Sequence, residues 1–324
     1  MEACIIVTYR CNAKCHMCNT WQYPTKPQEE ITPAIINKLP SGLGFINITG
    51  GEPFLRTDLA EIIQTVLPKT KRLVISSNGY FTERMVELAK RFPSIGFRIS
   101  IEGLPAVNDQ LRGMKDGFDR GLRSLLELKA LGLKDIGFGM TVSDENAKDM
   151  IELYRLADSM RLEFATASTH NSYYFHKHDN YFNNPDMVAA EFERISCELL
   201  KTKRIKNWFR AYFNHGMANY VRGGKRLLSC EVGTDMVFID PYGKVLPCNG
   251  MDNEAVMGDL TKQPFEEIWN GKQAEDVREA VKKCSKNCWM IGSVAPAMRK
   301  AKLTPLKWII KRKLGIVDKG CSCG

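Results

Sequence analysis

The chain has 324 residues, 44% of them hydrophobic, which is enough for one large domain, or one large and one small, with a full-sized core. It shows no signal-peptide pattern and no apolar run long enough to span a membrane. We therefore expect a cytoplasmic protein whose eleven cysteines are reduced and serve metal sites rather than disulfides. The formal net charge is +9, but residues 299–319 hold eight basic side chains and one acidic one. Most of the excess thus lies in the C-terminal tail, and we expect no nucleic-acid partner.

Strands and helices are predicted to alternate from residue 3 to about residue 167. The expected strands cover residues 3–8, 45–49, 72–76, 96–101, 136–142 and 162–167. The expected helices begin near residues 33, 58 and 82, and two more cover residues 118–131 and 146–160. This alternation indicates parallel β/α units, as a partly closed barrel or an open doubly wound sheet, with the active site at the carboxyl ends of the strands.

Three cysteines follow the first expected strand at C-x3-C-x2-C spacing: Cys11, Cys15 and Cys18. Thiolates favour zinc, copper(I) or iron–sulfur clusters. A structural zinc needs four ligands and this loop offers three, whereas a cluster held by three cysteines keeps one iron open to another ligand. We interpret the loop as an iron–sulfur site. Three unrelated buried cysteines would be the alternative, but three within eight residues is far above chance spacing.

The ends of the next strands carry small and polar residues. Gly50-Gly51-Glu52-Pro53 follows the second strand, where the glycines let the backbone approach a ligand and Glu52 offers a charge for an ammonium group. Asn78 follows the third strand, and Ser100 and Glu102 lie at the end of the fourth. Such residues are typical of a ligand-binding rim and also of plain solvated loops.

The cysteine loop combined with Gly-Gly-Glu-Pro resembles the radical SAM superfamily from residue 3 to about residue 167. The resemblance implies a partial (β/α)6 TIM-like barrel in which Cys11, Cys15 and Cys18 hold a [4Fe–4S] cluster whose open iron is chelated by S-adenosylmethionine (SAM). It implies further contacts to SAM from Gly50, Gly51, Glu52, Pro53, Asn78, Ser100, Glu102 and Arg112. Such a cluster, reduced by a donor such as flavodoxin or ferredoxin, cleaves SAM to a 5′-deoxyadenosyl radical that abstracts a hydrogen atom from the substrate.

The chain changes character after residue 167. Residues 168–185 are rich in aromatic side chains and histidine, and we interpret them as an insertion that lines a substrate pocket or forms a lid, with a packed loop as the alternative. Helical patterns follow over residues 185–202, which include Cys197, and over residues 205–222.

A second cysteine set follows: Cys230, Cys248, Cys284 and Cys288. A hairpin is predicted at Met236–Ile239 and Lys244–Leu246, and a helix over residues 264–283. Four cysteines from a hairpin and a helix end can close around one cluster; a structural zinc site and four independent thiols are the alternatives.

The C-x12-G-x4-C spacing and the Glu-Glu-Ile-Trp-Asn helix resemble the SPASM domain in its shortened Twitch form, a small α+β cluster-binding domain. This resemblance implies one auxiliary [4Fe–4S] cluster ligated by Cys230, Cys248, Cys284 and Cys288, with Cys321 or Cys323 as replacements for Cys288. We expect a radical SAM core at residues 1–212, the SPASM-like domain at 213–297 and a basic amphipathic tail at 298–324.

The tail has an apolar face made of Leu303, Leu306, Trp308, Ile309, Ile310 and Leu314. A basic amphipathic helix of this kind suits a membrane surface or an acidic partner, and a helix docked on the barrel with its lysines in solvent is the alternative. The first possibility would place the protein peripherally at the inner membrane face.

An auxiliary cluster ligated by four cysteines leaves no iron for substrate, so we expect it to move electrons. The sequence therefore predicts oxidation or dehydrogenation of a small-molecule or lipid-linked substrate. One alternative is maturation of a peptide by crosslinking or epimerisation, the latter with Cys197, Cys321 or Cys323 as candidate hydrogen donors. Alternatives of another class are an electron-transfer iron–sulfur protein and a zinc-stabilised binding module, but neither explains the strand-end motifs.

Overall fold

The structure is a computed structural model that describes residues 1–251 and 255–316. Its centre is a nine-stranded sheet in the order β6-β5-β4-β3-β2-β1-β7-β8-β9. The strands are β1 (Glu2–Ile6), β2 (Phe45–Thr49), β3 (Leu73–Ser77), β4 (Gly96–Ser100), β5 (Ile136–Val142), β6 (Glu163–Ser168), β7 (Met236–Ile239), β8 (Lys244–Leu246) and β9 (Gly258–Asp259).

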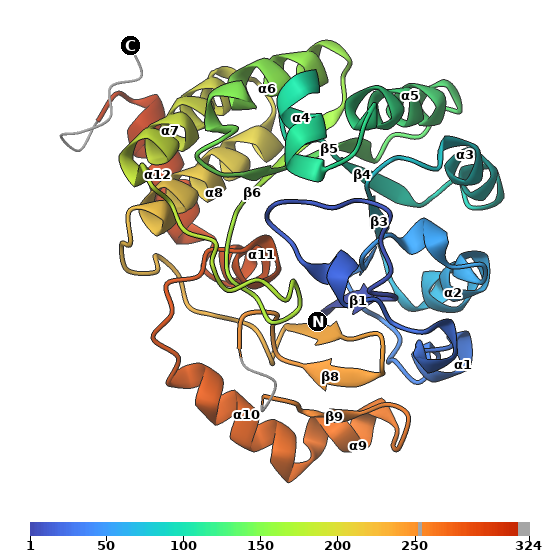
Figure 1. Ribbon diagram of the computed structural model, residues 1–324. Coiled ribbons are helices and arrows are strands. Elements are labelled where there is room, and N and C mark those ends of the chain that lie inside the picture. The colour runs from blue at the N-terminus through green and yellow to red at the C-terminus, as the bar shows by residue number, and fades with distance from the viewer. Residues whose placement is uncertain (252–254, 317–324) are drawn as a thin grey trace.

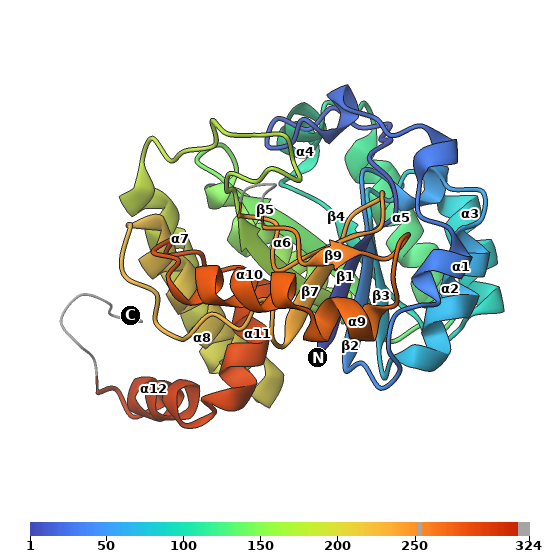
Figure 2. The ribbon, with the colours of Figure 1, turned by 90° about the horizontal axis from the view of Figure 1, so that it is seen from below.

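Strands β1 to β6 are all parallel, and they curve into a partial barrel that does not close, because β6 and β9 stand at the two ends of the sheet (Figure 1). The predicted fold class is therefore confirmed, and each of the six parallel strands lies within two residues of its expected bounds. The helices that cover the outer face are α1 (Pro33–Ile36), α2 (Leu59–Val66), α3 (Thr82–Arg91), α5 (Gly117–Ala130) and α6 (Met150–Ser159), whereas α4 (Pro105–Arg112) lies at the carboxyl ends of the strands, beside the first cysteine loop (Figures 1 and 2).

The core lies between the strands and these helices. Ile48, Ile75, Phe97, Ile99 and Phe138 are fully buried in it. Because side chains alternate between the two faces of a strand, the residues next to them in the sequence point to the opposite, inner face of the sheet. Those inner positions are largely polar, which indicates that this face lines a site rather than a second apolar core.

The second half of the chain continues the same sheet. Strand β7 lies parallel to β1, with Glu2 opposite Met236 and Ile5 opposite Ile239, and β8 and β9 add antiparallel strands beyond it. The remaining helices are α7 (Pro185–Lys201), α8 (Ile205–Val221), α9 (Phe265–Asn270), α10 (Lys272–Lys282), α11 (Ile291–Lys300) and α12 (Leu303–Lys313). The expected domain boundary at residue 212 falls inside α8, and the domain limits remain a prediction.

Two helix predictions need correction. The single helix expected over residues 264–283 is broken at Gly271, whose backbone is extended (φ −77°, ψ 157°), and it forms α9 and α10 instead. The tail was expected to present one apolar face, yet Trp308 stacks on His215 of α8 and Ile309 is buried, while Leu303, Leu306, Ile310 and Leu314 are exposed. None of the described helices is long and apolar enough to cross a membrane.

Candidate functional site

A cavity of about 2300 Å³ occupies the inner face of the partial barrel. Asn47 of β2, Ser76 of β3 and Ser100 of β4 line it, as the two-residue period of the strands requires. Both cysteine sets line it too: Cys11, Cys15 and Cys18 of the first, and Cys230, Cys248, Cys284 and Cys288 of the second. Ligand pockets usually measure about 300–1000 Å³, so this cavity has room for cofactors and a substrate together.

The first cysteine loop leaves β1 beside the Gly-Gly turn that follows β2. The amide of Gly51 donates to the carbonyl of Thr8 at 2.7 Å, and the amide of Glu52 donates to that of Arg10 at 2.8 Å. A Cβ atom on Gly50 would lie 2.6 Å from the Thr8 oxygen, and one on Gly51 would lie 2.8 Å from the Tyr9 oxygen. The glycines are therefore needed so that this turn can pack against the base of the cysteine loop.

Helix α4 and strand β3 hold the same loop from other sides. The amide of Lys14 donates to the carbonyl of Arg112 at 3.0 Å, and that of His16 donates to the carbonyl of Leu111 at 2.8 Å. The side-chain amide of Asn78 donates to Asn12 Oδ1 at 2.8 Å. The positions of the three thiols are thus set by contacts from three separate elements.

Glu52 is fully buried and links the Gly-Gly turn to the end of β3. Its carboxylate accepts hydrogen bonds from the Phe54 amide at 3.1 Å, the Ser77 hydroxyl at 2.9 Å and the Asn78 amide at 2.7 Å. Pro53 is also buried and begins a short 3-10 helix, Pro53–Leu55. Both oxygens of Glu52 are therefore engaged within the chain, and its contact with an ammonium group remains a prediction.

Arg112 and Glu102 form a buried ion pair in the wall of the cavity, with 2.8 Å between Arg112 Nη1 and Glu102 Oε1. Burial opposes the charge of Arg112, but Cys15 and Glu102 outweigh this effect and raise its pKa further. Arg112 Nε is buried and has no hydrogen-bond partner among the described residues. A guanidinium with an unused N–H at a cavity wall suits a carboxylate ligand.

The three thiols of the first loop are mostly shielded from water. Burial raises the pKa of Cys11 to about 12, and it also raises the pKa values of Cys15 and Cys18. A bound metal centre would supply the positive charge that stabilises the thiolates. Within residues 1–251 and 255–316, no three His, Cys, Asp or Glu side chains are placed to hold a single metal ion. The donor set fits an iron–sulfur cluster, because all its donors are thiols.

The second cysteine set comes from three segments: Cys230 lies before β7, Cys248 follows β8, and Cys284 and Cys288 follow α10. Burial raises the pKa of Cys248 to about 11, and the nearby thiols of Cys230 and Cys288 contribute to the shift. The Arg226 guanidinium donates to the carbonyl of Cys288, and Lys286 Nζ donates to the carbonyl of Gly250 at 2.5 Å. All four thiols line the same cavity, with Cys230 and Cys284 exposed, and their ligation of one cluster remains a prediction.

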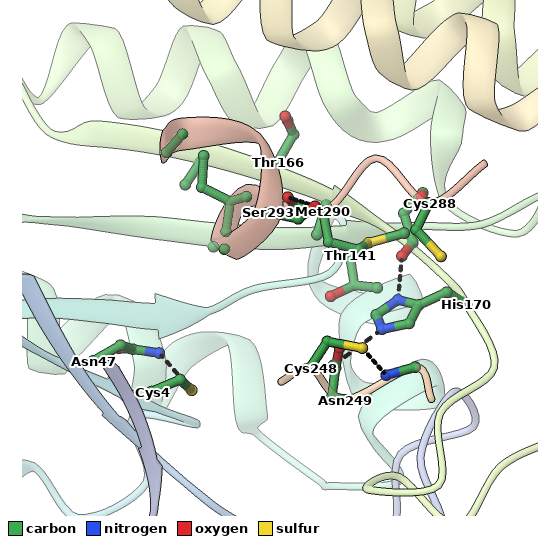
Figure 3. A pocket seen from close by; sticks show the side chains of 18 of the residues that line it. Cys4, Asn47, Thr141, Thr166, His170, Cys248, Asn249, Cys288, Met290 and Ser293 are labelled. Atoms are coloured by element: carbon green, nitrogen blue, oxygen red, sulfur yellow. Dashed lines mark hydrogen bonds between the residues drawn. The ribbon is translucent and has the colours of Figure 1, made fainter. Parts of the chain in front are cut away.

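The segment after β6 connects the two cysteine loops. On one side the Asn19 amide donates to the Phe175 carbonyl at 2.8 Å. On the other, Ser172 Oγ donates to the Asn249 carbonyl at 2.6 Å, and His170 Nε2 lies 3.3 Å from Asn249 Nδ2, next to Cys248 (Figure 3). His170 and Phe175 line the cavity, which agrees with the predicted pocket-lining role of this segment.

Two cavity residues with unused polar groups were not singled out from the sequence, although Ser168 lies within the segment 168–185 that was predicted to line a pocket. Ser168, at the end of β6, is fully buried, and Trp21 follows the cysteine loop. Ser168 Oγ and Trp21 Nε1 are buried and have no hydrogen-bond partner among the described residues, so each has an unused polar group at the cavity. The sequence signal for Ser168 is its place at a strand end and in that segment. Among the candidate hydrogen donors, Cys197 lies on α7 outside the cavity lining, and Cys321 and Cys323 lie outside the described residues.

Comparison with known proteins identifies the family to which this chain belongs. The family profile described as Radical SAM superfamily matches residues 5–157, and the profile of the SPASM iron–sulfur cluster-binding domain matches residues 230–289. A solved structure of native anSMEcpe with bound AdoMet superimposes with a TM-score of 0.62 at 12% identity, covering 96% of this chain and 99% of that one, which supports the fold.

Three curated relatives have different named activities. Fe-coproporphyrin III synthase of Methanosarcina barkeri is 33% identical over 48% of this chain and 40% of its own length. Pre-heme d1 synthase of Dinoroseobacter shibae is 26% identical over 82% of this chain and 72% of its own. The antilisterial bacteriocin subtilosin biosynthesis protein of Bacillus subtilis is 26% identical over 83% of this chain and 59% of its own. The chain thus spans less than two thirds of two of these three relatives.

The radical SAM domain implies a [4Fe–4S] cluster and SAM, and the SPASM domain implies auxiliary iron–sulfur binding, which agrees with the two thiol sets around one cavity. This chain is a member of the radical SAM superfamily of enzymes and carries a C-terminal SPASM iron–sulfur domain.

Proposed function

We propose that this enzyme oxidises or dehydrogenates a small-molecule or lipid-linked substrate, with the auxiliary cluster supporting electron transfer. The observation that carries the proposal is that both cysteine sets line the same cavity. A substrate bound between them would lie beside the group that removes a hydrogen atom and also beside a group that can accept an electron.

The first half of the chain binds and orients the cofactors in this proposal. Cys11, Cys15 and Cys18 would hold the first cluster. When bound, this cluster and SAM supply hydrogen-atom abstraction driven by an external electron donor such as flavodoxin or ferredoxin. The unused Nε–H of Arg112 would bind a carboxylate of SAM, and Gly50, Gly51 and Ser100 would form the surface beside it. Asn78 and Glu52 fix the cysteine loop and its neighbouring turn, and Glu52 would also offer its charge to the ammonium group of SAM.

The second half would hold one auxiliary [4Fe–4S] cluster through Cys230, Cys248, Cys284 and Cys288. The segment after β6 would cover the space between the two clusters and limit the access of water, since it contacts both loops. Ser168 and Trp21 offer unused polar groups to a ligand in that space.

The proposal is tested by anaerobic purification and reconstitution, followed by iron and sulfide analysis and by assay for 5′-deoxyadenosine with dithionite and SAM. We expect about eight irons per chain, and about four after Cys11, Cys15 and Cys18 are changed to alanine. Only the unaltered protein should form 5′-deoxyadenosine. Bound zinc without 5′-deoxyadenosine would contradict the proposal.

The substrate class is tested with extracts of cells grown in deuterated medium, separated into small-molecule, lipid and peptide fractions. The fraction that transfers deuterium into 5′-deoxyadenosine contains the substrate, and we expect the small-molecule or lipid fraction. Peptide maturation is the second candidate, because one relative is a bacteriocin biosynthesis protein. Transfer from the peptide fraction alone would favour it. Solvent deuterium at the reacting carbon would then indicate epimerisation rather than oxidation.

A further inference from the structure

Helix α12 is a feature that the proposed chemistry does not use. It packs against α8 by its inner side, where Ile309 is 2% exposed and the Trp308 ring lies 4.9 Å from that of His215 and 5.6 Å from that of Tyr212. Figures 1 and 2 both show α12 at the margin of the molecule, on the side away from α1 to α3. Its outer side faces away from the rest of the chain.

That outer side is apolar. Leu303 is 68% exposed, Leu306 43%, Ile310 48% and Leu314, at the end of the helix, 69%. At about 100° per residue these four positions fall within an arc of about 80°, so they form one narrow stripe. The stripe is separate from the face that packs on α8, and nothing in the described part of the chain buries it.

Basic side chains flank the stripe on both sides. The same helical geometry places Lys307 and Lys311 along one edge, and Lys302 and Lys313 along the other. Of these four, Lys313 is engaged with α8, because its Nζ lies 3.8 Å from the centre of the Trp208 ring. Residues 302–313 contain five basic side chains and no acidic one. On α11, by contrast, Arg299 pairs with Glu2 at 2.7 Å and Lys300 pairs with Glu231 at 2.5 Å. No ion pair within residues 1–251 and 255–316 involves Lys302, Lys307 or Lys311.

We propose that α12 is an interfacial helix that seats this enzyme on the surface of an anionic phospholipid bilayer. An exposed apolar stripe flanked by lysines is the pattern of a helix that lies in the membrane interface, its apolar residues among the acyl chains and cations such as Lys307 and Lys311 at the phosphates. A second copy docked through the same stripe would bring two sets of lysines together, and charge repulsion opposes this arrangement.

Membrane binding through α12 would also orient the active site. Met298 and Lys302, at the junction of α11 and α12, line the large cavity. A chain held by α12 would therefore have one end of its cavity close to the lipid surface, where a lipid-linked substrate could enter. This orientation rests on the proposed function, whereas membrane binding by α12 does not.

The test is flotation of the full chain, with its clusters reconstituted, on vesicles of phosphatidylcholine alone and of equal parts of phosphatidylcholine and phosphatidylglycerol. We expect binding to the anionic vesicles, weaker binding to the neutral ones, and loss of binding at high salt. Leu306→Ser combined with Ile310→Ser should lower the affinity by about tenfold or more. Lys307→Gln combined with Lys311→Gln should lower it by about tenfold on anionic vesicles only.

Matched controls make the same chemical changes elsewhere on the surface. Leu126→Ser with Leu131→Ser, and Lys90→Gln with Lys134→Gln, should leave binding unchanged. Iron content and circular dichroism show whether each variant is folded.

Absence of binding to anionic vesicles, or equal binding by the α12 variants and the controls, would overturn the proposal. Self-association that the α12 variants abolish without vesicles would assign the stripe to a second copy instead. Since flotation does not depend on 5′-deoxyadenosine formation, failure here is distinguishable from failure of the proposed function.

Discussion

Arg112 and Glu102 are joined by a buried ion pair of 2.8 Å, and the second oxygen of Glu102 accepts the amide of Thr141 at 2.5 Å. The pair links the end of α4, which holds the cysteine loop, to the ends of β4 and β5. It therefore connects the position of the first cysteine loop to the wall of the cavity.

Changing Arg112 to glutamine should lower stability by about 3–5 kcal/mol, because an uncompensated carboxylate would remain buried. It should also weaken SAM binding, because the unused Nε–H is lost. Urea unfolding and equilibrium dialysis with labelled SAM measure the two effects.

The double variant with Glu102→Gln and Arg112→Gln separates the effect on stability from the effect on SAM binding. Removal of both charges should restore much of the stability while SAM binding stays weak. If the double variant recovered both properties, Arg112 would be a structural residue without a role in binding.

Changing Gly51 to alanine should destabilise the protein by about 1–3 kcal/mol, since the added methyl group would collide with the backbone of Tyr9 and Arg10. The cysteine loop should shift as a consequence, and reconstituted iron should fall by up to about four atoms per chain. Gly250→Ala is the matched control, because a Cβ there meets no atom within 4 Å. Equal iron content in the two variants would contradict this view of the turn.

Changing Cys248 to alanine should separate SAM cleavage from product formation. The first cysteine loop is intact in this variant, so 5′-deoxyadenosine should still form, while oxidised product should fall by at least about tenfold if electrons leave through the second set. Cys4→Ala is the control, because Cys4 lines the cavity but belongs to neither set. Full product formation by the Cys248 variant would exclude an electron-transfer role for that set.

Protonation of the Glu163 carboxylate should contribute to the unfolding of the protein in acid. Burial alone would raise its pKa, but Arg210 and Lys206 outweigh burial and lower the pKa from 4.5 to about 2. The folded state therefore binds the proton more weakly than the unfolded state, and the stabilisation is present above pH 4.5 and is lost as the pH falls toward 2.

The loss should amount to about 3 kcal/mol over that range. Urea unfolding of the wild type and of Glu163→Gln at a series of pH values measures it, because loss of the clusters in acid affects both chains alike. The variant should show a smaller pH dependence, and Glu152→Gln, on the surface of α6, should behave like the wild type. Identical curves for Glu163→Gln and the wild type would contradict the prediction.

Much of the fold could be predicted from the sequence, because buried parallel strands are short apolar runs and most of the helices carry an apolar stripe. The hairpin at Met236–Ile239 and Lys244–Leu246 was also predicted correctly from its Asp-Pro-Tyr-Gly turn. Helix α4 was missed because its polar Asn108 and Asp109 resemble a loop. The break at Gly271 was missed because an apolar pattern continues on both sides of it.

The candidate site was predicted only as far as its parts are local in sequence. Cysteine spacing indicates that thiols form a set, but it does not indicate that two sets face one cavity. The direction of the Glu52 carboxylate, the unused hydroxyl of Ser168 and the pairing of β7 with β1 all depend on contacts between distant segments. Such contacts are decided by packing, which local patterns do not contain.

The pairing of β7 with β1 also limits how this protein can be divided. If the chain were cut before β7, the edge of β1 from Glu2 to Ile5 would lose its partner and expose unpaired backbone groups beside apolar side chains. An edge of that kind invites pairing with other chains and aggregation. The first half, although it contains the residues 5–157 that match the radical SAM profile, is therefore expected to be poorly soluble when expressed alone, because the C-terminal domain covers the strand from which the first cysteine loop begins.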